Sequence, residues 1–183
     1  MSTEASLTGV ERHFGEDDII VSKTDLKGRL TYANKTFLEI SGYSEKEVLG
    51  QPHSLIRHPH MPRTIFNLLW STIESGKEIF AYVNNRCKNG DNYWVFAHVT
   101  PSFDGNGRVA GYHSNRRIPD RRILSEHVLP LYEQLRKAEQ SVVNRKDGMQ
   151  AGMKILDAVL AERGLAYDEF IATLGQRRRR GYR

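Results

Sequence analysis

Residues 78–116 read EIFAYVNNRCKNGDNYWVFAHVTPSFDGNGRVAGYHSNR, and this stretch decides the fold. It contains two turn signals, Lys88-Asn89-Gly90-Asp91 and Asp104-Gly105-Asn106-Gly107. Asn-Gly between strand-forming residues is the strongest short hairpin signal known from sequence. The flanking segments alternate in polarity or are rich in β-branched and aromatic residues, as strands are. The stretch therefore predicts a meander of three antiparallel strands at 78–87, 92–101 and 108–116.

Upstream of the meander, a further hairpin and several short helices are predicted. Strands at 19–21 and 29–32 flank a turn at 25–28. Asn34 can cap a short helix, because its side chain can accept a hydrogen bond from the first turn. A longer helix begins at Pro62 and runs to about Ser75. The order of elements predicts an α+β fold in which one five-stranded antiparallel sheet carries short helices on one face.

Downstream, Pro119-Asp120 ends the strand pattern, and residues 120–174 show helical periodicity. Pro130 should kink or restart this helical stretch. The apolar positions Met149, Met153, Leu156, Val159 and Leu160 form a stripe that needs a partner surface. Residues 120–174 are therefore expected to form a helical hairpin or a coiled-coil arm.

Composition restricts the function classes. Hydrophobic residues make up 39% and charged residues 27% of the chain, which favours a packed core. The net charge is +5, but residues 177–183 hold five arginines; without them, 22 basic residues balance 22 acidic ones. A neutral body argues against a nucleic-acid surface. The single cysteine, Cys87, allows no intramolecular disulfide. With no signal peptide and no long apolar run, a cytoplasmic protein without membrane insertion is expected.

The passage from Pro52 to Pro62 contains His53, His58 and His60 beside Arg57. Three interpretations remain open. It is a polar loop with solvated histidines, a ligand-binding loop in which the guanidinium recognises phosphate, or a metal or haem site built on imidazoles. The histidine spacing matches no strong zinc pattern.

Two further residues are candidates for a binding site. Trp70 lies on the long predicted helix, where a tryptophan packs in the core or against a cofactor. Asn85 lies on a predicted strand, where asparagine is depleted, and its amide can both donate and accept hydrogen bonds. A buried Asn85 would suit the edge of a heterocycle, whereas an exposed one would be a turn-proximal residue. The sequence contains no acid–base dyad, nucleophile triad or phosphate loop, which favours a binding module over an enzyme.

Residues 19–116 resemble a PAS domain of the aerotaxis-receptor family. The matching stretches are Tyr32-Ala33-Asn34-Lys35-Thr36-Phe37, Gly50-Gln51-Pro52-His53, Arg57-His58-Pro59-His60-Met61-Pro62 and the segment from Lys88 to Val95. The resemblance implies non-covalent FAD whose redox state reports oxygen or electron transport. It implies cofactor roles for Arg57, His58, Trp70 and Asn85. His60 departs from the pattern, because family members commonly carry aspartate there.

The interpretation adopted is a sensor that binds FAD and signals to a chemotaxis or other signal-transduction protein, most simply as a homodimer. The candidate cofactor-binding residues are Asn34, His53, Arg57, His58, His60, Trp70, Asn85 and Trp94. The chain is expected to comprise an N-terminal cap segment at 1–17, a PAS sensor domain at 18–118, a helical signalling or dimerisation extension at 119–175 and a basic tail at 176–183. The rivals are a haem-binding PAS sensor, with His53, His58 or His60 as axial ligand, and a cofactor-free PAS dimerisation module.

Overall fold

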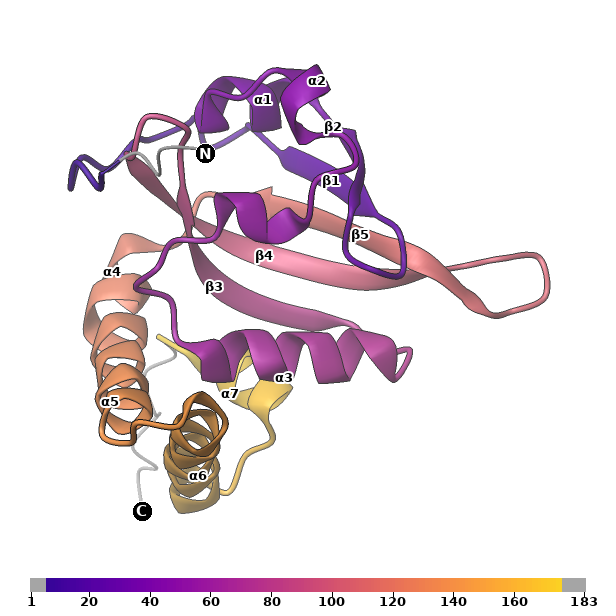
Figure 1. The fold of residues 1–183 in the computed structure, drawn as a ribbon. Helices are drawn as coiled ribbons and strands as arrows, with labels where there is room; N and C mark the ends of the chain where they lie inside the picture. Colours follow the sequence, from indigo (N-terminus) through magenta and orange to yellow (C-terminus); the bar gives the residue numbers. More distant parts are fainter. Residues whose placement is uncertain (1–5, 176–183) are drawn as a thin grey trace, which may run out of the picture. The chain divides into compact units, whose positions relative to one another are not determined.

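The computed structural model describes residues 6–175 (Figure 1). The chain divides into two compact units, the first ending at Pro119 and the second beginning at Asp120. The predicted basic tail at 176–183 lies outside the described residues, as do residues 1–5.

The first unit contains one antiparallel sheet of five strands, ordered β2-β1-β5-β4-β3. Both predicted parts of the sheet are present, and they join because β1 pairs with β5. The predicted α+β class and the five-stranded antiparallel sheet are confirmed. The strands are β1 (Ile20–Thr24), β2 (Leu30–Ala33), β3 (Ile79–Arg86), β4 (Asn92–Phe103) and β5 (Val109–Arg117).

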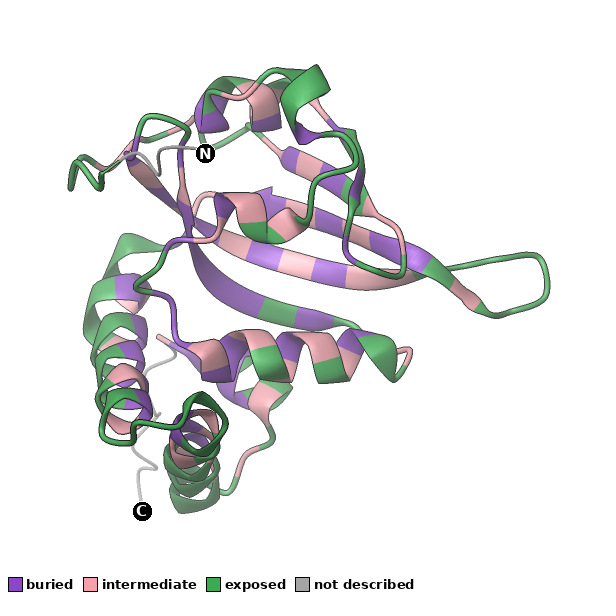
Figure 2. Cartoon of the chain, in the orientation of Figure 1, coloured by how far each residue is buried: buried purple, intermediate pink, exposed green. Residues whose placement is uncertain are grey.

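Short helices connect β2 to β3 and lie over one face of the sheet (Figure 1). Asn34 caps the first of them as predicted, since its Oδ1 accepts from the Phe37 backbone N–H at 3.0 Å. The long helix α3 turns Ile65, Leu69 and Ile73 into the core, which gives it the alternation of buried and exposed positions in Figure 2. The helices are α1 (Lys35–Ser41), α2 (Glu45–Val48), the 3-10 helix η1 (His53–Ile56) and α3 (Arg63–Glu74).

The N-terminal segment runs beside the Asn-Gly turn that joins β3 to β4. The Thr8 backbone N–H donates to the Gly90 carbonyl at 3.0 Å, and the Asn92 N–H donates to the Val10 carbonyl at 2.9 Å. Asp91 accepts from the Arg12 side chain at 2.8 Å and from the Thr8 hydroxyl at 2.6 Å. These hydrogen bonds lower the pKa of Asp91 to about 2, so this carboxylate stays charged while it holds the segment.

The second unit is helical, as predicted. Helices α5 and α6 pack against each other, and Gly148, Gly152 and Leu156 are buried one turn apart along α6. Pro130 lies at the start of α5, directly after a π-helical segment. No helix within residues 6–175 has both the length and the apolar character needed to cross a bilayer. The elements are α4 (Arg121–Ile123), the π-helical η2 (Leu124–Val128), α5 (Leu129–Gln140), α6 (Arg145–Arg163) and α7 (Tyr167–Thr173).

Candidate functional site

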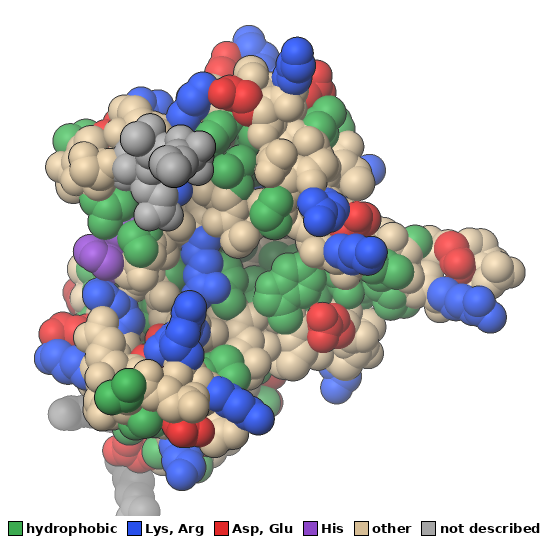
Figure 3. Space-filling model, viewed as in Figure 1, with side chains coloured by type: hydrophobic (Ala, Val, Ile, Leu, Met, Phe, Trp, Pro, Cys, Tyr) green, Lys and Arg blue, Asp and Glu red, His purple; other side chains and the backbone are tan. Residues whose placement is uncertain are grey.

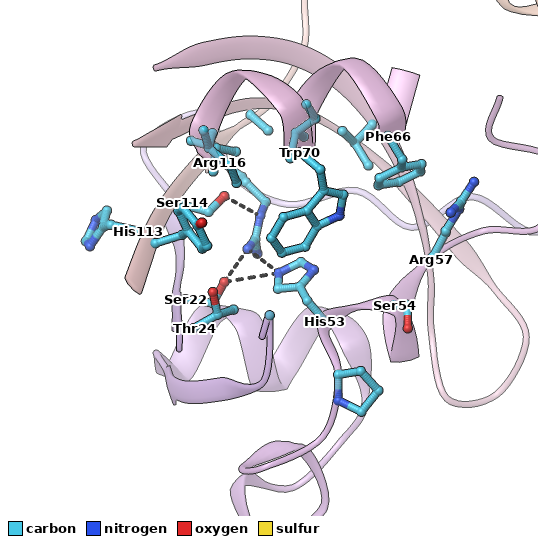
Figure 4. Close-up of a pocket in the computed structure, with 18 of the residues that line it drawn as sticks. Ser22, Thr24, His53, Ser54, Arg57, Phe66, Trp70, His113, Ser114 and Arg116 are labelled. Atoms are coloured by element: carbon cyan, nitrogen blue, oxygen red, sulfur yellow. Dashed lines mark hydrogen bonds between the residues drawn. The ribbon is translucent and has the colours of Figure 1, made fainter. Parts of the chain in front are cut away.

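A cavity of about 230 Å³ lies in the first unit, between the sheet and the segment formed by η1 and α3 (Figure 4). Inward-facing residues of β1, β3, β4 and β5 form one wall, and residues of η1 and α3 form the other. In the space-filling view, a hollow lies where the sheet and α3 are seen, bordered by hydrophobic side chains and by Lys or Arg side chains (Figure 3). The short helices thus enclose a site against the sheet rather than packing flat on it.

Trp70 forms the apolar wall contributed by α3. Its ring meets Tyr112 of β5 edge to face, with centroids 5.6 Å apart. On its other side it lies against Gly28, where an added Cβ would sit 2.7 Å from the indole Cη2. Gly28 also has a φ of +73°, so the turn itself favours glycine. Trp70 therefore lines the cavity and closes on the β1–β2 turn at the same time.

Arg116 of β5 is the centre of a buried hydrogen-bond network (Figure 4). Its Nε donates to Ser114 Oγ at 3.0 Å, and its Nη2 donates to Ser22 Oγ and to His53 Nε2, the latter at 2.8 Å. Ser22 Oγ lies 3.2 Å from the same His53 nitrogen. Because arginine only donates, His53 Nε2 must accept, which places the imidazole proton on Nδ1.

The charges in this network are unequal. Burial, and then the Arg116 charge, lowers the pKa of His53 to about 3, so the imidazole is neutral at physiological pH. Burial lowers the pKa of Arg116 only to about 10, so the guanidinium stays charged. No carboxylate in the described part of the chain pairs with Arg116, and the centroid of the Phe37 ring lies 5.6 Å from its Cζ.

Two donors near this network lack a partner. Arg116 Nη1 and Asn85 Nδ2 are both buried without a hydrogen bond, and both residues line the cavity. Leaving a buried donor unpaired costs roughly 1–3 kcal/mol, so such atoms indicate a missing ligand or water. We call Ser22, His53, Asn85, Ser114 and Arg116 the deep end of the pocket.

The opposite part of the lining is more exposed, and we call Lys27, Ser54 and Arg57 the rim. The Arg57 guanidinium lies 4.0 Å above the ring of Phe66, which also lines the cavity. Together with Arg116, the rim gives the cavity three cationic side chains. Its described lining contains no aspartate or glutamate, so the pocket suits a ligand with negative charge.

The structure brings four of the eight candidate residues to the cavity, namely His53, Arg57, Trp70 and Asn85. The other four, Asn34, His58, His60 and Trp94, do not line it. The Asn34 amide is occupied locally: besides capping α1, it accepts from the Val21 N–H at 3.0 Å and donates to the Ile19 carbonyl at 2.8 Å.

The remaining three, His58, His60 and Trp94, are near lining residues in the sequence but do not line the cavity. His58 is buried, and its Nδ1 accepts from the backbone N–H of His60 at 3.2 Å. The two rings meet edge to face with centroids 4.9 Å apart, and His60 itself is exposed. Trp94 alternates with the inward-facing Ala97 along β4 and therefore lies on the opposite face of the sheet.

Sequence reasoning missed Arg116 and its supports Ser22 and Ser114. A signal was available, since Tyr112, Ser114 and Arg116 occupy alternate positions of one predicted strand and share a face. An arginine at a buried strand position is unusual enough to mark a site. The single cysteine, by contrast, offers no chemistry here: Cys87 is buried, does not line the cavity, and has a pKa raised by burial to about 11.

Residues 30–116 match the family described as PAS fold. This region is a PAS domain. The chain is 39% identical over 142 residues to the aerotaxis receptor of Escherichia coli, covering 77% of this chain and 28% of the receptor. It is 28% identical over 99 residues to a nitrogen fixation regulatory protein of Klebsiella pneumoniae, covering 54% and 20%. The chain thus spans only about a quarter of the length of these relatives.

Solved structures with the same fold include the light state of the blue-light photoreceptor Aureochrome1 LOV. It superposes with a TM-score of 0.54 at 21% identity, covering 61% of this chain and 89% of that one. Its dark state also gives a TM-score of 0.54, at 20% identity, covering 63% and 86%. At this level of identity the likeness establishes the PAS/LOV fold and carries no residue roles.

Proposed function

We propose that this chain is a sensor that binds FAD non-covalently in the cavity of its PAS domain and reports redox or oxygen status to a signal-transduction partner. The observation that carries the proposal is the cavity lining: aromatic walls, three cations without an acid, and three buried polar groups without a partner, on Thr24, Asn85 and Arg116. The similarity to an aerotaxis receptor supports the same assignment.

The cavity residues fit a flavin. A volume of about 230 Å³ lies below the roughly 300–1,000 Å³ of pockets for drug-sized ligands. It therefore suits a ring system, with the rest of a dinucleotide leaving past the rim. Trp70 and Tyr112 offer aromatic surface, Asn85 and Arg116 offer donors, and Lys27 and Arg57 offer charge for phosphates.

Bound FAD would supply reversible uptake of electrons and protons, and Asn85 is suited to respond to it. An amide can present either its N–H or its C=O to the same neighbour by turning over. Asn85 lies on β3, opposite Tyr93 of β4, whose hydroxyl is also buried without a partner. A change in the Asn85 orientation would therefore be felt across two strands, and a partner that prefers one arrangement would read it as a population shift.

The partner and the setting follow from the same proposal. We expect a cytoplasmic protein that associates with a chemotaxis or other signal-transduction protein, most simply as a homodimer. The helical unit from Asp120 onward, with its apolar positions on α6, would be the signalling or dimerisation extension. The expected role is sensing rather than catalysis.

The absorption spectrum of the protein purified as expressed tests the proposal. A bound flavin gives two bands, in the blue and the near ultraviolet, and mass analysis of the heat-released compound distinguishes FAD from FMN. One intense Soret band would instead indicate haem, although His53 Nε2 is already engaged by Arg116 and Ser22. Colourless protein without a releasable cofactor would favour a dimerisation module and overturn the proposal.

A further inference from the structure

We propose that Arg116 contacts the acceptor edge of the bound flavin ring, around N1 and the adjoining carbonyl, and favours the negatively charged reduced form of the cofactor. This inference rests on the proposed function, because it assigns a role within the same pocket. None of the sequence motifs that resemble the aerotaxis-receptor family includes Arg116, which lies at the far end of β5.

The buried charge of Arg116 is not compensated by an anion within the described residues. Arg116 is 2% exposed, and its three hydrogen-bond partners, Ser22, His53 and Ser114, are all neutral. Taking a cation out of water is costly unless an anion or a full set of hydrogen bonds replaces the water. Neither is complete here, since Nη1 has no acceptor and no described acid forms an ion pair with this side chain. A ligand with negative charge would complete both.

The unpaired donors of Asn85 and Arg116 come from two strands of the same cavity wall. Asn85 is on β3 and Arg116 is on β5, the two strands that flank β4. Both residues line one cavity, and each has a buried N–H group without a hydrogen bond. The Thr24 hydroxyl, also buried there without a partner, can act as a further donor. The ring edge that answers this pattern is one of carbonyl oxygen and imine nitrogen. In a reduced flavin, N1 and the C2 carbonyl are also where the negative charge gathers.

The hydrogen-bond network fixes the Arg116 guanidinium in place. Ser114 accepts from Nε while Ser22 and His53 accept from Nη2 (Figure 4), which leaves Nη1 as the terminal nitrogen without a hydrogen bond. A fixed charge in a low-dielectric site interacts more strongly with a developing negative charge than a solvated one does. Held in this way, Arg116 would stabilise the reduced ring more than the oxidised ring.

The test compares midpoint potentials in the full chain loaded with FAD. R116Q removes the charge, R116K keeps it, and R117Q is the matched control, because Arg117 follows on the same strand and is exposed. We expect R116Q to reduce the ratio of reduced to oxidised flavin at least tenfold at a fixed potential, which lowers a two-electron midpoint by about 30 mV or more. R116K should retain most of the wild-type value, and R117Q should match it.

A second measurement uses wild-type apoprotein, in case R116Q does not fold. Binding of riboflavin is compared with binding of 1-deazariboflavin, in which a C–H replaces the N1 acceptor. We expect at least tenfold weaker binding of the analogue. An unchanged potential in R116Q, or equal binding of the two ring systems, would overturn the role of Arg116 while leaving the flavin proposal intact. Wild-type protein that binds no flavin would overturn the proposed function itself.

Discussion

Arg57 and Arg116 line the same pocket under opposite physical conditions. Arg57 lies at the rim, partly open to solvent, with its guanidinium 4.0 Å above the Phe66 ring. Arg116 is buried at the deep end, held by side-chain oxygens and an imidazole nitrogen. Solvent and salt weaken the field of the first charge, whereas the second acts in a water-poor environment. The rim can attract an anionic ligand, but the deep end can discriminate between its charge states.

The largest effects on flavin affinity are expected from variants that remove contacts in the interior of the pocket. Trp70→Ala and Asn85→Ala should each lower flavin affinity by up to about a hundredfold, because a lost stacking contact or hydrogen bond costs roughly 1–3 kcal/mol. Titration of apoprotein with FAD, followed by fluorescence, measures the effect.

Two matched controls lie on the other face of the sheet. Trp94→Ala and Asn84→Ala remove the same residue types from β4 and β3, at positions that do not line the cavity. Both should keep wild-type affinity even where they lower the melting temperature. If a control variant lost as much flavin affinity as the matched pocket variant, the assignment of residues to the pocket would be wrong.

Removing the charge of Arg57 at the rim should have a smaller effect on FAD affinity than removing interior contacts. Arg57→Ala should weaken FAD binding by up to about fivefold, since a part-exposed ion pair contributes about 1 kcal/mol or less. Riboflavin, which lacks phosphates, should be affected little. The difference should shrink in high salt, as it does for solvent-exposed charges. Competitive titration with FAD, FMN and riboflavin at two salt concentrations is the measurement, and an equal loss for all three would give Arg57 a structural role.

The smallest expected effect on binding comes from shortening the chain. All residues that line the cavity belong to the unit that ends at Pro119, so a fragment without residues 120–183 should keep wild-type flavin affinity. It should lose any redox-dependent change in association. Removing only residues 176–183 should alter neither property. Size-exclusion chromatography of oxidised and reduced protein is the measurement, and a shortened fragment that still changes association would place the output on the sheet.

Local sequence signals predicted the sheet because its turns are formed by adjacent residues of characteristic types. The turns at Asn89-Gly90 and 104–107 depend on the residues within them, so they can be recognised from the sequence without knowledge of tertiary contacts. The pairing of β1 with β5 is different, because it joins residues about ninety positions apart. No local pattern specifies that contact, although it completes the sheet.

The same distinction between local and long-range signals applies to the residues of the candidate site. Arg57 and His53 belong to a conspicuous run of residues and were found, and both line the cavity. Arg116 belongs to an ordinary strand, and its role depends on Ser22 and His53, which are distant in sequence. Asn34 does not line the cavity. It caps α1 and bonds to β1, and a residue with such a structural role can be part of a family motif just as a binding residue can.

Gly28 links the turn between β1 and β2 to the wall of the pocket. Its positive φ admits few residues other than glycine or asparagine, and Trp70 occupies the space that any side chain would need. The two positions are therefore epistatic: a side chain at 28 meets both the left-handed backbone and the indole, and a smaller residue at 70 would remove only the second obstacle. In an evolving sequence, a substitution at position 28 would therefore be expected to follow a change at position 70 rather than precede it.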